Sequence, residues 1–260
     1  MGLDAPSPLA LHRIRSLSPD HWFEPLADHL GAAYLRYSFT RGTANEVAFL
    51  VDALGLAPGQ RVLDVGCGPG RHARALADLD FEVVGIDISQ RFIDLARQDA
   101  PGGARFERLD ARDLPFDAEF DAVISLCQGA FGLAGGVAPA PPLDADPDGV
   151  ILAGMARALR PGGRLAVSAF SAYFQVRFLE PTDAFDAESG VNLEHTVVKD
   201  DHGVDAPADL WTSCFTPREL RLLARAAGLT PEHLWSVTPG AYGANPPDLD
   251  HPEFLLLARR

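Results

Sequence analysis

Short apolar runs alternate along the chain with segments in which apolar residues recur at helical spacing. Strands are predicted for five runs: RVLDVG (61–66), FEVVGID (81–87), ARFERLDA (104–111), FDAVISLCQG (120–129) and RLAVSAF (164–170). Between the first two runs, Ala73, Leu76 and Ala77 give one apolar helical face. Strands that alternate with helices at this interval predict an α/β fold with a parallel, doubly wound sheet.

Polar residues before two of the helical segments predict where those helices begin. In TANEVAFLVDALGL, Thr43 and Glu46 have the spacing of a capping box. In TPRELRLLARAAGL, Thr216 and Glu219 have the same spacing, and Pro217 takes the first helical position. We therefore expect a helix to begin at each of these boxes.

The alternation changes outside this region. Residues 1–20 are rich in proline and residues 21–38 have helical spacing, so residues 1–42 are predicted to form a helical lid or extension whose aromatic residues pack on the core or cover a ligand. Residues 171–215 contain strand-like runs around an Asp-Asp-His-Gly turn, and this insertion either extends the sheet or forms a cap. EHLWSVT and PEFLLLARR predict two last strands, which completes one domain over residues 43–260.

Composition limits the classes of ligand and partner. The 260-residue chain has a formal net charge of −14, and an acidic surface disfavours a nucleic-acid partner. Its three cysteines give neither a disulfide framework nor a metal-binding spacing, so no metal is expected. The N-terminal segment lacks the apolar core of a signal peptide and no segment is typical of a membrane span, which predicts a soluble, cytoplasmic monomer or homodimer.

Three glycines follow the first predicted strand, as in loops that hold a nucleotide-like ligand. Gly66, Gly68 and Gly70 have the spacing G-x-G-x-G. The dinucleotide fingerprint needs a small residue at the next position, where this chain has Arg71. Asp87 ends the second strand, 21 positions after Gly66, and its carboxylate suits the two hydroxyls of a ribose. NAD and S-adenosylmethionine both carry such a ribose, so Asp87 alone leaves both open.

Two other carboxyl groups favour S-adenosylmethionine. Asp64 lies inside the first strand, shortly before the glycines. A carboxylate there would repel a pyrophosphate, but it suits a ligand that carries a sulfonium and an ammonium and no phosphate. Asp110, at the end of the third strand, can accept a hydrogen bond from an adenine amino group. Three adjacent strands therefore each end near an acid.

With these residues the sequence resembles the class I S-adenosylmethionine-dependent methyltransferases, in particular the small-molecule methyltransferase-11/25 type. The motifs that carry the resemblance occur in order: VLDVGCGPG, VVGIDIS, RLDARDLPF, FDAVISLCQGAFG and ALRPGGRLAVSAF. They lie within residues 43–170, with a weaker likeness through FTPRELRLLARAAGL. The resemblance implies a Rossmann-like, seven-stranded sheet in the order 3-2-1-4-5-7-6, with strand 7 antiparallel. It also implies that S-adenosylmethionine binds along the carboxyl ends of strands 1 to 4 and leaves as S-adenosylhomocysteine.

The resemblance implies roles for individual residues. It assigns Asp64, Gly66, Gly68 and Gly70 to the methionine part of the cofactor, Asp87 to the ribose, Ile88, Asp110 and Ala111 to the adenine, and Leu126, Cys127 and Gln128 to the neighbourhood of the transferable methyl. Cys67 is expected near Cys127 at the cofactor, as a small apolar group. Arg41, before a predicted helix, is either a partner of the methionine carboxylate or a solvated cation.

Methyl transfer from a sulfonium requires alignment more than it requires catalytic side chains. The charge of the sulfonium activates the leaving group, so the protein must align the nucleophile with the methyl and exclude water. A base is needed only where the nucleophile starts protonated, and no catalytic triad is visible. The catalytic residues therefore stay unassigned, with His195 and Tyr242 as candidates. The substrate-facing candidates are Phe131, Tyr173, Trp211 and Tyr242.

The loop after the fourth strand narrows the class of substrate. Methyltransferases that act on nucleic-acid amino groups often carry an Asn/Asp-Pro-Pro-aromatic element there, whereas this chain has LCQGAFG. We therefore expect methyl transfer to an oxygen, nitrogen or carbon atom of a small molecule, with neither nucleic acid nor membrane as partner. Three alternatives stay open: a non-catalytic S-adenosylmethionine-binding partner protein, an NAD-dependent oxidoreductase, and a protein or RNA methyltransferase.

Overall fold

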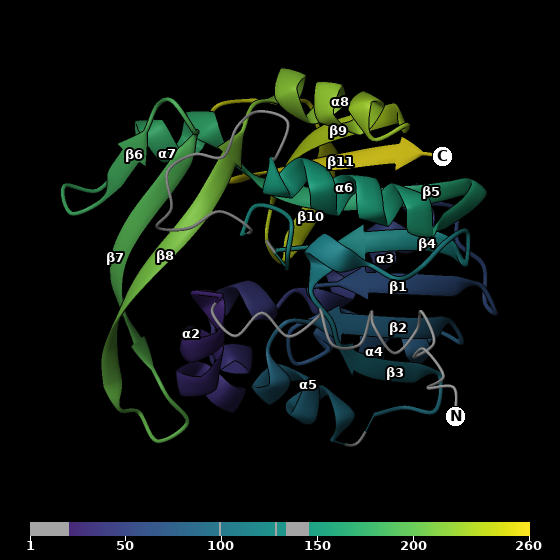
Figure 1. Ribbon diagram of the computed structural model, residues 1–260, viewed down its shortest axis with the longest axis horizontal. Coiled ribbons are helices and arrows are strands. Elements are labelled where there is room, and N and C mark those ends of the chain that lie inside the picture. Colours follow the sequence, from purple (N-terminus) through teal and green to yellow (C-terminus); the bar gives the residue numbers. More distant parts are fainter. Residues whose placement is uncertain (1–20, 99, 128, 134–145) are drawn as a thin grey trace, which may run out of the picture.

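The computed structural model describes residues 21–98, 100–127, 129–133 and 146–260, and a twisted sheet with helices on both faces lies at its centre (Figure 1). The strands of this sheet follow one another in the order β10-β9-β11-β5-β4-β1-β2-β3. This confirms the predicted order of the seven strands, to which β10 adds one at the edge. The strands are β1 (Arg61–Val65), β2 (Glu82–Asp87), β3 (Ala104–Arg108), β4 (Phe120–Ser125), β5 (Leu159–Ser171), β9 (Thr230–Thr238), β10 (Ala241–Asn245) and β11 (Glu253–Arg259).

The first strand lies between two parallel neighbours. β1 pairs with β2, where Asp64 is opposite Gly85, and with β4, where Asp64 is opposite Ile124. From β1 the chain builds β2 and β3 on one side, and later β4 and β5 on the other. The carboxyl ends of these parallel strands share one edge, and a crevice is expected where the strand order reverses, beside β1 and β4.

The strand β11 runs antiparallel to both of its neighbours, as predicted for strand 7. Leu256 is opposite Val167 of β5 and Leu234 of β9. Because β11 runs against β5, its first residue lies beside the end of β5, where Glu253 is opposite Phe170. The start of β11 therefore lies at the same edge as the carboxyl ends of the parallel strands.

Two helical layers cover the sheet, and successive residues of a strand face one layer and then the other. The helices are α3 (Thr43–Ala53), α4 (Arg71–Ala77), α5 (Gln90–Arg97), α6 (Pro147–Ala158) and α8 (Pro217–Ala226). Leu63 and Val65 of β1 pack in one core with α6 and α8, whereas Val62 packs in another with α3, α4 and α5. By this alternation Asp64 faces the layer that contains α4.

The two predicted capping boxes have different outcomes. The box at Thr216 and Glu219 is confirmed, because each side chain accepts a hydrogen bond from the other residue's backbone N–H. The box at Thr43 and Glu46 is wrong. Helix α3 does begin there, but Gly42 is its N-cap and no side chain caps it. Glu46 instead points inward, where it is fully buried and binds two basic side chains of α4.

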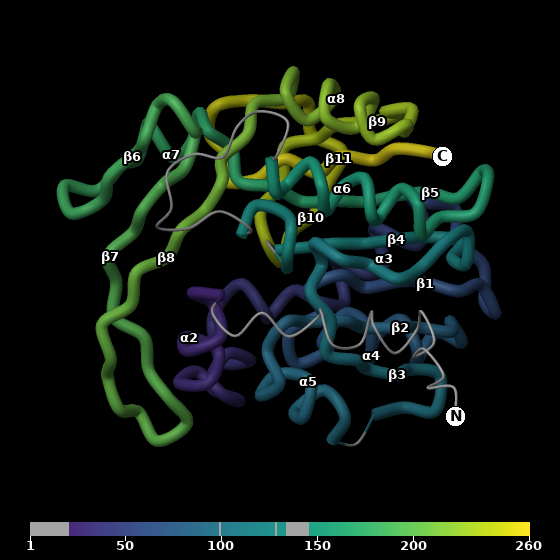
Figure 2. The backbone as a smooth tube through the Cα atoms, viewed as in Figure 1, coloured from purple at the N-terminus to yellow at the C-terminus, as the bar shows by residue number. Residues whose placement is uncertain are grey.

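The insertion forms a long hairpin that joins the sheet at one end. Its elements are α7 (Ala172–Arg177), β6 (Ala184–Asp186), β7 (Val191–Lys199) and β8 (Asp205–Phe215). β7 and β8 are antiparallel around the predicted turn, and the end of β8 pairs in parallel with the end of β5, with Cys214 opposite Phe170. Figures 1 and 2 show this hairpin extending along one side of the molecule to α2 (Phe23–Leu30).

The N-terminal segment is helical, as predicted, but only part of it is an α-helix. Helix α2 ends at Leu30, because Gly31 follows with φ +48. The 3-10 turns η1 (Gly31–Arg36) and η2 (Ser38–Thr40) lead from there to α3. The expectation for residues 1–20 lies outside the described residues.

The tip of the hairpin contacts this N-terminal segment. The Asp201 carboxylate accepts a hydrogen bond from the Ala32 N–H (3.2 Å), and the Asp200 carbonyl accepts one from the Arg36 guanidinium (3.1 Å). Val198 of β7 packs in one cluster with apolar residues of α2. Two segments far apart in the sequence therefore meet over the carboxyl edge of the sheet. The division into lid, domain and insertion stays a prediction.

Candidate active site

Two adjoining cavities lie at the carboxyl edge of the sheet. The smaller is lined by residues that follow β2, β3 and β4. The larger, of about 300 Å³, extends from the glycine loop to the N-terminal segment and to the ends of β5 and β8 and the start of β11. Gly66 and Asp87 line both cavities, so the two cavities adjoin at these residues.

The glycine loop brings the ends of β1 and β4 into contact. Gly66 has φ +74, and a Cβ atom there would lie 1.9 Å from the backbone of Gly129 in the loop after β4. Gly70 precedes α4 with φ +84, and a Cβ atom there would lie 2.8 Å from the ring of Phe106. Larger residues would push these elements apart. Of the predicted glycines, Gly66 and Gly68 line the larger cavity, whereas Gly70 serves the packing of α4.

Asp87 lies where the two cavities meet. Its Oδ2 accepts a hydrogen bond from the Gly68 N–H (2.9 Å), and its Oδ1 accepts one from the Ser89 N–H (2.8 Å). These bonds fix the carboxyl group at the end of β2, and burial raises its pKa to about 6. Each carboxylate oxygen keeps a lone pair for one more donor, which is what a ribose with two hydroxyls requires.

Asp64 lies in β1, two residues before the glycine loop, and has 1% of its surface exposed. Burial raises the pKa of Asp64 to about 7, although the charge of Arg71 opposes this. Its Oδ2 has no hydrogen-bond partner among the described residues. A buried acceptor without a donor is costly, so a cationic ligand at the loop would stabilise this carboxylate.

The three residues predicted for the adenine line the smaller cavity together. They are Ile88, Asp110 and Ala111. Asp110 accepts hydrogen bonds from the Arg112 guanidinium (2.9 Å to Oδ1 and 2.6 Å to Oδ2) and from the Arg112 N–H. Although burial opposes it, these bonds lower the pKa of Asp110 below its usual value. The smaller cavity is therefore lined by the ionised carboxylate of Asp110, which can accept a hydrogen bond, and by the apolar side chain of Ile88.

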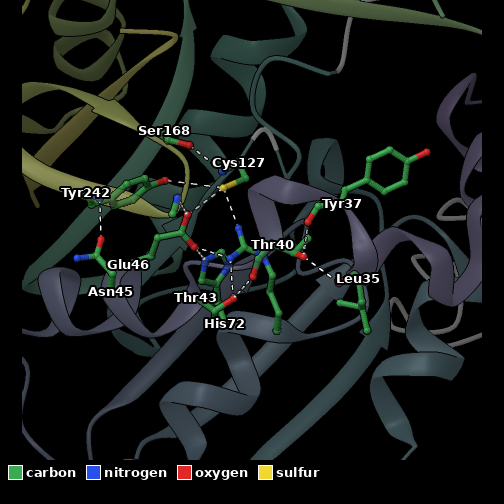
Figure 3. A network of polar contacts seen from close by, with 12 residues as sticks. Leu35, Tyr37, Thr40, Thr43, Asn45, Glu46, His72, Cys127, Ser168 and Tyr242 are labelled. Atoms are coloured by element: carbon green, nitrogen blue, oxygen red, sulfur yellow. Dashed lines mark hydrogen bonds and ion pairs between the residues drawn. The ribbon is translucent and has the colours of Figure 1, made fainter. Parts of the chain in front are cut away.

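A polar network joins α3 and α4 to the turn between β9 and β10, and Figure 3 shows the Glu46 carboxylate at its centre. Glu46 binds the Arg71 guanidinium and the His72 ring (2.7 Å), and it accepts a hydrogen bond from the Gly240 N–H (2.7 Å). Burial alone would raise the pKa of Glu46, but His72 and Arg71 lower it to about 2. One ionised carboxylate therefore holds three elements together.

Arg71 extends this network to the end of β4. Its guanidinium donates to the Cys127 sulfur (2.8 Å), while the Cys127 N–H donates to Ser168 Oγ (2.7 Å). Cys127 lines the larger cavity, and burial raises the pKa of its thiol, which stays neutral. Arg41, the predicted partner of the methionine carboxylate, is exposed and is not among the described residues that line either cavity. The buried guanidinium beside Cys127 belongs to Arg71.

Two of the predicted substrate residues lie in the core. Phe131 is fully buried and stacks on Phe215, with ring centroids 4.8 Å apart. Tyr242 in β10 is buried, its ring lies edge-on to Phe49, and its hydroxyl is 3.9 Å from the Cys127 sulfur. Neither residue is among the described residues that line the cavities. Tyr242 therefore contacts Cys127, which lines the larger cavity, from the core side.

Two other candidates lie on the hairpin. Trp211 lies between Leu210 and Thr212, which line the larger cavity. Because side chains alternate along a strand, Trp211 points to the opposite face of β8. His195 lies on an exposed part of β7, where its Nδ1 is 2.7 Å from Oδ1 of Asp209 on the paired strand.

The remaining predicted residues have mixed placements. Tyr173 in α7 is 42% exposed and contacts Phe254 with its ring. The side chains of Cys67 and Leu126 pack in the core with α3 and α4. Gln128 lies outside the described residues. The substrate candidates are thus dispersed, whereas seven of the cofactor candidates line the two cavities: Gly66, Gly68, Asp87, Ile88, Asp110, Ala111 and Cys127.

Covering a ligand was one of two roles predicted from the sequence for the N-terminal aromatic residues, but few of the other residues that line the larger cavity were predicted. The N-terminal segment contributes the aromatic rings of Trp22, Phe23, Tyr34, Tyr37 and Phe39. Phe170 of β5 and Glu253 of β11 line the other side. A signal for Glu253 existed, because an antiparallel last strand must begin at the carboxyl edge and the second residue of PEFLLLARR is an acid.

Two features are absent from the described ranges. No group of three or more His, Cys, Asp or Glu side chains there is arranged to hold a metal ion. No helix in these ranges is both long and apolar enough to cross a membrane. The absence of a metal from the reaction and the cytoplasmic location both stay predictions.

Comparison with known proteins identifies relatives of the central part of the chain. Residues 62–163 match a family described as a methyltransferase domain. The demethylmenaquinone methyltransferase of Clavibacter sepedonicus is 33% identical over 150 residues, which cover 55% of this chain and 56% of that protein. The chain spans about half the length of the curated relatives it matches.

Solved structures resemble nearly the whole chain. The CcbJ methyltransferase from Streptomyces caelestis has a TM-score of 0.69 at 20% identity and covers 92% of this chain and 96% of its own. CalS10, an amino pentose methyltransferase from Micromonospora echinaspora solved with bound S-adenosylmethionine, has a TM-score of 0.60 at 25% identity, with 88% and 95% covered. The fold therefore extends beyond the segment that the family match covers.

Proposed function

We propose that this chain, whose residues 62–163 match a methyltransferase domain, methylates a small molecule bound in the larger cavity, with S-adenosylmethionine as the methyl donor. One observation carries the proposal: two cavities adjoin at Gly66 and Asp87, and only one of them is the size of a second ligand. A methyl donor that occupies the smaller cavity and the glycine loop would expose its methionine end to the larger one.

The residues present fit S-adenosylmethionine. Asp87 would accept both ribose hydroxyls, and the smaller cavity would hold the adenine between Ile88 and Ala111, with the Asp110 carboxylate at its amino group. Asp64 would offset the positive charge at the methionine end, because its buried carboxyl oxygen has no donor among the described residues. When bound, the cofactor supplies a methyl carbon activated by the sulfonium.

The chain's own contribution to the reaction is alignment and exclusion of water. The glycine loop, fixed to Asp87 by the Gly68 N–H, sets the position of the donor. The aromatic rings of the N-terminal segment line the larger cavity and would hold an acceptor against that position without water. Cys127, held by Arg71 and Ser168, forms part of the wall of the larger cavity.

Calorimetric titration of the purified protein with S-adenosylmethionine, S-adenosylhomocysteine and NAD tests the proposal. We expect both sulfur nucleosides to bind and NAD to give no response, because Asp64 would repel a pyrophosphate. Binding of NAD without any response to S-adenosylhomocysteine would overturn the assignment in favour of an oxidoreductase.

A further inference from the structure

We propose that Glu253 selects the methyl acceptor, and that the acceptor is an apolar amine whose protonated nitrogen pairs with this carboxylate. The inference rests on the proposed function, because it concerns the second ligand of the same cavity. The inference goes beyond the proposed function because it names the chemical class of the second ligand and the residue that recognises this ligand.

Glu253 is a buried acid in the wall of the larger cavity. It is 1% exposed and lines the cavity at the start of β11, opposite Phe170 of β5. Its charge acts on the end of β4: after burial itself, Glu253 is the largest cause that raises the pKa of the Cys127 thiol. Glu253 therefore lies near the part of the cavity where the transferable methyl is expected.

The rest of the wall suits a cation with an apolar body. Rings of Trp22, Tyr34, Phe39 and Phe170 line the cavity. No Lys, Arg or His is among the described residues that line it, and its carboxyl groups are Asp87, at the ribose position, and Glu253. Aromatic faces and a carboxylate both attract a cation, whereas a carboxylate repels an anion. An ammonium on an apolar skeleton matches this wall, and an acidic acceptor does not.

The same carboxylate can prepare the nitrogen for methylation. A protonated amine has no lone pair, so its N–H bond must break before methyl transfer. The proton passes to a carboxylate oxygen of Glu253, and the electron pair stays on nitrogen. That pair forms the new N–C bond as the C–S bond of the donor breaks and its pair remains on sulfur. Glu253 then holds one proton, and the product amine carries one more methyl.

Binding measurements test the inference without a known substrate. The parent protein and Glu253→Gln would each be saturated with S-adenosylhomocysteine and titrated with aryl-alkyl amines and with aryl-alkyl carboxylates of matched length. For the parent we expect at least about tenfold tighter binding of the amines, and for Glu253→Gln we expect that preference to disappear. Glu253→Asp keeps the charge and should keep the preference at lower affinity. Glu82→Gln, which alters an acid whose side chain is 69% exposed on β2, is the matched control and should behave as the parent.

The outcomes separate this inference from the proposed function. Failure of the parent to bind S-adenosylhomocysteine would overturn the proposed function. Normal binding of S-adenosylhomocysteine would overturn this inference alone if the amines fail to bind, if the carboxylates bind as tightly, or if Glu253→Gln keeps the preference. Thermal melts of all variants show whether each one is folded. If Glu253→Gln is unstable, the preference of Glu253→Asp for amines over carboxylates is the measurement that tests the inference.

Discussion

At the scale of single residues, Asp87 tests the cofactor site most directly. It would accept two hydrogen bonds from ribose hydroxyls, and bonds to a charged group are stronger than neutral ones. We expect Asp87→Ala to lose about 2–4 kcal/mol of affinity for S-adenosylhomocysteine, roughly 30-fold to 1000-fold. Calorimetric titration measures the loss.

Asp113→Ala is the control for Asp87→Ala. Asp113 is a nearby carboxylate, and it is not among the described residues that line either cavity. It should bind S-adenosylhomocysteine as the parent does. Thermal melts without ligand separate binding from folding, because Asp87 also accepts bonds from the Gly68 and Ser89 N–H groups. Parental affinity in Asp87→Ala would show that the ribose lies elsewhere.

We expect Asp64 to make cofactor binding depend on pH. Burial raises the pKa of Asp64 to about 7, and the ammonium of a bound ligand would favour the ionised form. Below that pH the ligand must displace a proton, so affinity for S-adenosylhomocysteine should rise with pH, by up to about tenfold per unit for one proton. Asp87, with a pKa of about 6, adds to the slope at lower pH.

The measurement for Asp64 is calorimetry in buffers of different ionisation enthalpy across this range. Proton release should accompany binding below neutrality and fade above it. In Asp64→Asn the part of the dependence centred near neutral pH should vanish. A parent whose affinity does not change with pH would contradict the placement of Asp64 at the cofactor.

Individual residues differ in how far the sequence reveals them. Asp87, Ile88, Asp110 and Ala111 line the cavities because each follows a parallel strand, and a strand end is visible in the sequence. Trp211 is not among the described residues that line the larger cavity. The sequence could not predict this, because alternation along β8 depends on a one-residue register that the sequence does not show. Nothing in the sequence alone distinguishes it from its neighbours.

At the scale of elements, Glu46 ties α3 to α4 and to the turn before β10. Its removal would leave the Arg71 and His72 side chains without their buried acceptor. Breaking a buried ion pair costs about 3–5 kcal/mol, so Glu46→Ala should lower the free energy of unfolding by about that amount. Urea unfolding measures it. Glu82→Ala should be close to the parent, since that side chain is largely exposed.

Low pH should remove the stability that Glu46 contributes by joining α3 to α4 and to the turn before β10. The pKa of Glu46 is lowered from 4.5 to about 2, so its contribution to stability is present above the higher value and is lost as pH falls toward the lower one. Urea unfolding of the parent and of Glu46→Gln across this range should show the two stabilities converging at low pH. A constant difference between them would contradict the lowered pKa.

The elements themselves were largely predictable, for local reasons. The five alternating strands and the box at Thr216 and Glu219 follow from hydrophobic period and from side chains that satisfy their own helix. The box at Thr43 and Glu46 failed because a buried arginine and histidine compete for the same carboxylate. That competition arises only after α3 and α4 pack together, so no local pattern reveals it.

At the scale of the whole molecule, three distant parts of the chain enclose the larger cavity. The N-terminal segment, the hairpin and the start of β11 each contribute wall residues such as Tyr34, Leu210 and Glu253. The sequence indicated the sheet and the cofactor edge, but an arrangement of separate segments around a ligand has no periodicity to detect. The substrate side of the site was therefore the part that only the structure could supply.

The whole site should function without a metal ion. No metal-binding cluster occurs among the described residues, and the sulfonium already activates the methyl group. Binding of S-adenosylhomocysteine, and methyl transfer once an acceptor is known, should survive EDTA. Loss of transfer on chelation with recovery on added magnesium would contradict this.

The position of β11 between β9 and β5 also limits the order in which the sheet can form during synthesis. β9 and β10 are made earlier, but β9 can reach β5 only through β11, which pairs with both. As the ribosome releases the chain, β1 to β5 can form a sheet before residues 253–259 are available. Until then the edge of β5 where β11 will pair is exposed, and an exposed strand edge can pair with other chains. The cofactor edge formed by β1 to β4 can therefore fold while the nascent chain is still attached to the ribosome. The wall of the larger cavity cannot be completed until β11 is released. A chain that stalls just before Glu253 would keep the residues proposed to hold the methyl donor but would lack the part of the larger cavity's wall that β11 contributes.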